Sequence, residues 1–197
     1  MYRPRMEKGI PMAYTIAMHH HRFAAWAAAR AAQRGLANSR IIIDALEGCG
    51  VKAVVDNPDD WPQTAGAFDV AHRNWCSVLL ERLLAAGVSK ATYGRAAKVI
   101  AIYLKSRIVL GGQQDSPFAT VIHPPIDRIL LQSLAGHLHA RDRPLADHLR
   151  ATTWTSLAND TYDDLIRRLR RAELDQPAFW CIERFWDPRG DEGSDEE

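Results

Sequence analysis

The segment AGVSKATYGRAAKVIAIYLK (residues 86–105) and the loop that follows it contain the residues best suited to chemistry. Lys98 and Lys105 lie seven positions apart, so they share one face if this segment is a helix. Asp127 follows Lys98 by 29 residues, at the end of the sequence HPPID. A carboxylate stabilises positive charge that develops beside it, and a lysine that has lost its proton can act as a nucleophile. Lys98 and Asp127 are therefore the two residues of this region best suited to such chemistry.

Each member of this pair also has an ordinary structural interpretation. Lys98 taken alone fits a helix lysine whose stem packs on apolar surface while its ammonium stays in water. Asp127 taken alone fits the N-cap of the apolar helix that is expected to follow it. The combination of the turn, the basic helix face and HPPID favours the catalytic interpretation, and Asp127 can cap a helix and serve in catalysis at once.

The turn that precedes Lys98 has two interpretations, and both place DNA beside it. In a helix-turn-helix protein, the turn leads into a short recognition helix with an exposed first turn. The helices expected here are long, and the second becomes strongly apolar toward Leu104 and Ile108, which favours a helix that crosses a core. In a helix-hairpin-helix element, backbone N–H groups at the start of the second helix bind a phosphate. We therefore expect DNA contacts from Gly87, Ser89, Lys90, Thr92, Gly94, Arg95 and Lys105.

A protein that extrudes a base from DNA also needs a pocket with a stacking wall. His20 and Arg22 are polar residues within an apolar helical segment close to Trp26, and they are either surface residues or pocket lining. Trp180 and Trp186 lie in the last helical segment, FWCIERFW, where one of them could border the pocket. The candidate base-pocket residues are His20, Arg22, Trp26 and Trp180.

The elements that would position these residues are all predicted to be helices. The chain shows helical periodicity and no strand-like alternation, which predicts an all-α fold in a single compact domain of about eight to ten helices. The domain is expected to span residues 12–188, after an N-terminal arm (residues 1–11) and before an acidic tail (residues 189–197).

Four helix features are specific enough to test. In the first helix, one face is expected to carry Ile16, Phe23, Ala27 and Arg30 or Ala31, which fall at helical spacing. Long helices are expected from about residue 66 to residue 86, and from Tyr93, capped by Thr92, to about residue 110. A helix after position 161 is expected to be capped by the threonine there, and a short last helix follows the proline at position 177.

The segments KVIAIYLK and PPID, with the turn before them, resemble the helix-hairpin-helix DNA glycosylases, most closely the archaeal 8-oxoguanine glycosylase branch. The resemblance covers residues 66–135, about a third of the chain. In that family an aspartate at a helix start supports the sugar as the base leaves, and a lysine acts as nucleophile; the resemblance assigns these roles to Asp127 and Lys98. The turn AGVSKATYG departs from the glycine-rich hairpin of the family, and the four-cysteine cluster of one branch is absent.

A looser resemblance concerns small bacterial glycosylases that act against phages with modified cytosines. It is based on HHHRFAAWAAARAAQRG and HPPIDRILL. It implies an enzyme that excises modified (glucosylated hydroxymethyl) cytosine from double-stranded phage DNA and leaves an abasic site. Repair of 8-oxoguanine by a glycosylase with lyase activity is one alternative, and a non-enzymatic helix-turn-helix DNA-binding protein is another. No cofactor is expected.

Composition and charge restrict the class of protein. The chain is 47% hydrophobic and 25% charged, as in ordinary globular proteins, and has no apolar run long enough to cross a membrane. Its three cysteines are far apart, which argues against a disulfide framework and favours a cytoplasmic protein. The tail DEGSDEE contains five acids, so the rest of the chain is more basic than the net charge of +1. We expect a monomer.

Two other groups of side chains have open interpretations. Four histidines at positions 123, 137, 139 and 148 raise the alternative of a metal-dependent hydrolase, but no HExxH spacing occurs and no metal site is expected. The arginines at positions 167, 168, 170 and 171 form a basic patch, which is either a solvated helix face or a track for phosphates.

Overall fold

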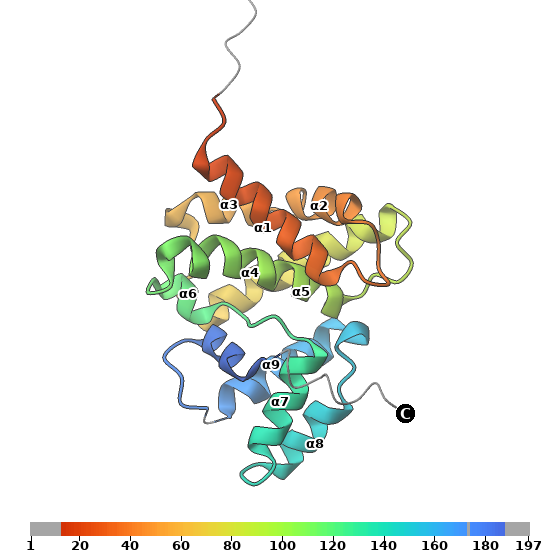
Figure 1. Ribbon diagram of the computed structural model, residues 1–197, viewed down its shortest axis with the longest axis vertical. Helices are drawn as coiled ribbons and strands as arrows, with labels where there is room; N and C mark the ends of the chain where they lie inside the picture. Colours follow the sequence, from red (N-terminus) through yellow and green to blue (C-terminus); the bar gives the residue numbers. More distant parts are fainter. Residues whose placement is uncertain (1–12, 173, 188–197) are drawn as a thin grey trace, which may run out of the picture.

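Nine α-helices make up most of the part of the chain that the computed structural model describes, residues 13–172 and 174–187 (Figure 1). No strand occurs among these residues, so the prediction of an all-α fold is confirmed. The expected arm (1–11) and acidic tail (189–197) lie outside the described residues. The helices are α1 (Ile16–Ala32), α2 (Ser39–Glu47), α3 (Val51–Asp56), α4 (Ala65–Ala85), α5 (Tyr93–Leu104), α6 (Pro117–Val121), α7 (Arg128–Leu138), α8 (Arg143–Ala151) and α9 (Asn159–Arg171).

Four further helical segments of other types connect or extend these α-helices. Three are 3-10 turns, and one is a π-helical segment that continues α5, so α5 ends at Leu104 and not near residue 110 as predicted. None of the helices among the described residues has the length and apolarity needed to span a bilayer. The segments are η1 (Pro58–Asp60), the π-helical η2 (Lys105–Gln113), η3 (Trp154–Ser156) and η4 (Phe179–Phe185).

Helix α5 is the centre of the fold. It packs against α1, α4, α9 and η3, and nine of its twelve residues are buried. The three that are not fully buried are Arg95, Lys98 and Ile102, which lie at helical spacing and form one stripe. In Figure 1, α1 to α6 form the upper part of the molecule and the antiparallel pair α7 and α8 its lower end. The stripe that contains Lys98 is the face predicted from the sequence.

Helix α1 does not bury the face that carries Ile16 and Phe23 at helical spacing. Ile16 is 83% exposed and Phe23 is 55% exposed, whereas a row of alanines faces α5. Alanine has a short side chain, so it allows the backbones of two helices to approach closely, and this close packing outweighs burial of the larger side chains. The buried residues of α1 are Ala24, Ala25, Ala28, Ala29 and Ala32.

The helix starts and stops that position the candidate site follow local rules. Thr92 caps α5 and Asp127 caps α7, both as predicted, by accepting backbone N–H groups. Helix α4 ends at Ala85, and Gly87 follows its C-cap with a φ of +80°, in the left-handed region that glycine adopts without strain. Helix α9 starts at Asn159, earlier than predicted, because the Thr161 side chain bonds back to the N–H of residue 158. The last segment, η4, is a 3-10 helix that begins two residues after the predicted proline.

Candidate functional site: a lysine–aspartate pair

Lys98 and Asp127 form an ion pair in the folded chain. The distance from Lys98 Nζ to Asp127 Oδ2 is 3.1 Å, and the side chains are only 11% and 15% exposed. Lys98 comes from the stripe of α5 and Asp127 from the start of α7. The structure thus brings together the two candidate catalytic residues, which are 29 positions apart in sequence.

The Asp127 carboxylate is held by three hydrogen bonds. Oδ1 accepts the backbone N–H of Leu130 at 3.0 Å, which is the N-cap bond of α7. Oδ2 accepts from Lys98 and from the indole Nε1 of Trp186 at 3.2 Å. The aspartate is therefore a helix cap and a member of the pair at the same time, and its orientation is defined from several directions.

Two tryptophans flank the pair, and the candidate set from sequence includes neither. The Lys98 ammonium lies 4.6 Å from the centre of the Trp154 ring, a cation–π geometry. Trp186, which donates to Asp127, is 42% exposed. Aromatic rings at such positions can stack on a nucleobase. The repeated aromatic residues of FWCIERFW pointed to Trp186 as an alternative to Trp180, whereas nothing local in the sequence singled out Trp154.

A second ion pair lies two turns further along the same face. Nζ of Lys105 pairs with Oε2 of Glu183 from η4. The Glu183 side chain is 14% exposed, and burial raises its pKa although Lys105 acts in the opposite direction. The charge of Asp127 also raises this pKa, so the two carboxylates belong to one electrostatic environment. Lys105 is therefore ion-paired within the protein with a side chain that is 30% exposed, so the predicted DNA contact would compete with Glu183.

The turn before α5 does not present the expected backbone clamp for a phosphate. The amide of Gly87 donates to the carbonyl of Leu84 in the last turn of α4, and the amide of Ser89 donates to the carbonyl of Gly87. The amide of Gly94 donates to the carbonyl of Leu157 at 3.0 Å, and a side chain at this glycine would overlap Trp154. Gly94 is thus a close contact within the protein, and the expectation that it admits a DNA backbone is wrong.

Of the remaining predicted DNA contacts, some side chains form hydrogen bonds within the protein and others are exposed to solvent. The Thr92 hydroxyl donates to the carbonyl of Thr155 at 2.7 Å, and Arg95 bonds the carbonyl of Arg34 at 3.3 Å. Ser89 and Lys90 are exposed. With Gly87 they border a hollow of about 570 Å³, whose opposite side is formed by residues 33–37 and Ile41. This hollow and the side chain of Lys90 remain the places where a phosphate could bind.

The predicted base pocket is not at the Lys98–Asp127 pair. His20 Nε2 bonds the carbonyl of Ser106 at 2.8 Å, so this part of α1 lies beside the far end of α5, roughly 12 Å along the helix axis from Lys98. Arg22 lies over the ring of Tyr14, and Trp26 is 50% exposed beside another ring of α1.

Trp180, the fourth predicted pocket residue, packs against the core, and its ring nitrogen is buried without a hydrogen-bond partner in the described part of the chain. Across the described residues, no hydrogen bond, ion pair or ring contact joins His20, Arg22, Trp26 or Trp180 to the pair.

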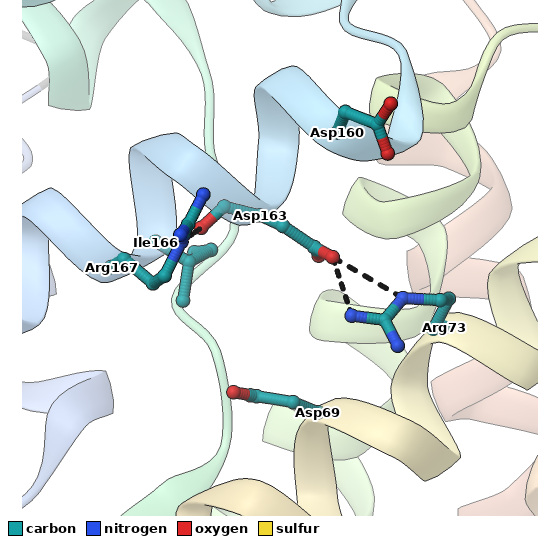
Figure 2. A pocket seen from close by; sticks show the side chains of 6 residues that line it. All are labelled: Asp69, Arg73, Asp160, Asp163, Ile166 and Arg167. Carbon is teal, nitrogen blue, oxygen red and sulfur yellow. Dashed lines mark hydrogen bonds and ion pairs between the residues drawn. The ribbon is translucent and has the colours of Figure 1, made fainter.

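Another hollow, of about 400 Å³, lies between α4 and α9, away from the pair (Figure 2). Arg73 donates two hydrogen bonds to Asp163 across it, and Asp69 lies on its floor. Arg167 and Arg168 pair with Asp164, and Arg170 binds Asp69 through both terminal nitrogens. The basic patch predicted on α9 is thus largely neutralised by neighbouring acids.

A buried polar cluster lies behind this hollow. His123 Nε2 lies 2.9 Å from Asp69 and its Nδ1 lies 3.2 Å from the hydroxyl of Tyr162. The ring centres of His72 and His123 are 4.4 Å apart, and burial lowers the pKa of both histidines. Burial opposes ionisation of Asp69, but hydrogen bonds from His123 and Arg170 hold its pKa far below the usual range. No group of side chains that could hold a metal ion occurs within residues 13–172 and 174–187.

Comparison of the chain with protein-family models, with curated proteins and with solved structures found no match.

Proposed function

We propose that this protein is a DNA glycosylase, in which Lys98 and Asp127 act on the sugar of an extruded nucleotide. The observation that supports this proposal most is the 3.1 Å contact between two largely buried, oppositely charged side chains that the sequence pattern selected. Both tryptophans that flank the pair are suited to stacking, which an extruded base needs.

The reaction makes use of the fixed carboxylate. As the bond from C1′ to the base nitrogen breaks, positive charge develops on the sugar. Asp127 is held by its helix cap bond and by Trp186, so its charge is in place before the reaction and needs no reorientation. Removal of water around the pair strengthens this interaction.

Lys98 can contribute in one of two ways. It can pass its proton to a neighbouring group and attack C1′, which forms a covalent link and permits strand cleavage. It can instead remain charged and bind a phosphate. Its contact with Asp127 and its 11% exposure favour a place at the sugar, beside the aspartate. A strand break without alkali would distinguish the first role from the second.

The burial of α5 argues against a helix-turn-helix repressor. A recognition helix exposes its first turn to the major groove. Here that turn is covered by residues 154–157, and nine of the twelve residues of α5 are buried. For the substrate, we propose modified cytosine in phage DNA, in its glucosylated hydroxymethyl form, with 8-oxoguanine as the alternative.

The test is release of bases from a panel of duplexes. The panel contains 8-oxoguanine, uracil, and hydroxymethylcytosine with and without glucose, each incubated with the wild-type protein and with Asp127→Asn. Asparagine caps helices as well as aspartate does, so the variant keeps the fold and loses the charge. We expect release of one modified base by the wild type and none by the variant. Tight binding of every duplex by both proteins, with no base released, would contradict the proposal.

A further inference from the structure

Glu183 provides a second carboxylate beside the Lys98–Asp127 pair, and the reaction as described does not use it. Its Oε2 pairs with Lys105, while Oε1 is buried and has no hydrogen-bond partner among the described residues. A buried polar atom without a partner is costly, and a fold tolerates few of them. A ligand that donates a hydrogen bond to Oε1 would satisfy this atom.

The position of Glu183 fits a ligand that also reaches Asp127. Glu183 lies in the last turn of η4, and Trp186 caps the end of this helix by donating its backbone N–H to the carbonyl of Glu183 at 2.9 Å, so the two residues are adjacent in space. Trp186 bonds Asp127, and Glu183 bonds Lys105, which continues the face of Lys98 beyond the end of α5. The two ion pairs are thus neighbours, about 10 Å apart along the axis of α5. A nucleotide placed with its sugar at the first pair would extend its base toward the second.

We propose that Oε1 of Glu183 accepts a hydrogen bond from the exocyclic amino group of the extruded base, so that the site selects cytosine-class bases over their uracil-class counterparts. This inference rests on the proposed glycosylase function, because it requires the sugar to lie beside Asp127. An ionised carboxylate can only accept hydrogen bonds. Cytosine offers an N4 amino donor, whereas uracil has a carbonyl oxygen at the same place, which would repel Glu183.

Lys105 and Trp186 have defined parts in this arrangement. Lys105 holds Oε2, which leaves Oε1 directed to the ligand. The Trp186 ring is 42% exposed and donates to Asp127, so it stays beside the pair and can stack on the base. Oε1 is buried in the free protein, so the Glu183 side chain shifts toward the incoming base. Because the base enters a largely buried site, one missing hydrogen bond to a charged group changes the rate of release by about 10- to 100-fold.

The experiment compares two duplexes that differ only at the amino group. One carries 5-hydroxymethylcytosine and the other 5-hydroxymethyluracil at the same position, each with and without glucose. Single-turnover base release is measured for the wild type and for Glu183→Gln. We expect the wild type to prefer the cytosine form by at least about tenfold. The glutamine amide can present either an oxygen or an NH₂ group, so the preference should collapse in the variant.

Lys105→Gln is the matched control, because it loses the same ion pair and keeps the carboxylate. We expect its rate to fall while its preference for the cytosine form persists. The wild-type ratio alone tests the inference if a variant does not fold, as judged by circular dichroism. Equal release of both bases by the wild type, or an unchanged ratio in a folded Glu183→Gln, would overturn the inference and leave the glycosylase proposal intact. Absence of release from these duplexes and from the whole panel that tests the proposed function, 8-oxoguanine included, would instead remove the glycosylase proposal.

Discussion

The buried histidine pair is expected to make the fold sensitive to mild acid. His72 is 1% exposed and His123 is 2% exposed, and burial lowers the pKa of both from the ordinary value of 6.5. Both therefore stay neutral in the folded chain at a pH where the histidines of the unfolded chain take up protons. Since the unfolded state then binds more protons, the free energy of unfolding falls as the pH is lowered through this range.

The size of the effect follows from the number of protons. Well below pH 6.5, each such histidine lowers the free energy of unfolding by about 1.4 kcal/mol per pH unit. Between pH 6 and pH 5 the average is closer to 1.2 kcal/mol for His72, whose pKa lies well below 6.5, and His123 adds a loss of the same sign. Asp69 adds a further loss only below about pH 4, where its carboxylate would be protonated in the unfolded chain. The main acid sensitivity thus comes from the histidines.

Urea unfolding at pH 7, 6 and 5 measures this dependence. The variant His72→Leu replaces one histidine with an apolar side chain of similar volume that takes up no proton. We expect it to lose about 1.2 kcal/mol less than the wild type between pH 6 and pH 5. The exposed His139→Gln is the control and should follow the wild type. His21, whose pKa burial also lowers, is common to all three proteins and cancels. Parallel curves for wild type and His72→Leu would refute the reasoning.

Two further predictions concern packing and thiol reactivity. Gly94→Ala should destabilise the fold by about 1–3 kcal/mol in urea unfolding, because the new methyl group meets the carbonyl oxygen of Trp154. The control Gly48→Ala meets only the flexible side chain of Arg82 and should cost less than about 0.5 kcal/mol. Equal costs for the two variants would contradict this explanation. Burial raises the pKa of Cys49 to about 11, so its thiol should resist alkylation at pH 7.5 until denaturant is added. Alkylation is read by mass spectrometry, and rapid labelling of Cys49 in the native protein would contradict its burial.

The candidate pair could be predicted from the sequence because both of its members depend on local rules. The spacing along α5 identified the stripe that contains Lys98, and the helix start at HPPID identified Asp127 as a cap. The sequence assigned both residues to one site but did not predict their direct contact, which is 3.1 Å in the structure. The caps Thr92 and Asn38 also follow from residue type and position alone.

The surroundings of the pair depend on contacts between distant segments, and for this reason they were missed. Trp154 reaches Lys98 because η3 packs on α5, and Glu183 reaches Lys105 because η4 folds back beside α7. Neither contact leaves a periodic or motif signal. The predicted position of His20 at the base pocket is wrong for the same reason, because the orientation of α1 along α5 places His20 beside Ser106. The alanine face of α1 shows that close helix packing can decide which side is buried, against the hydrophobicity of larger side chains.

The most direct test of the central claim is the single-turnover rate of base release by Asp127→Asn and Asp127→Ala, measured on the duplex that the wild type processes best. Both variants remove the charge, but only alanine removes the N-cap of α7, which should cost about 1 kcal/mol of stability. We expect both variants to lose at least about 100-fold in the rate of base release, while the asparagine variant keeps the unfolding free energy of the wild type. Base release by a stably folded Asp127→Asn at the wild-type rate would contradict it.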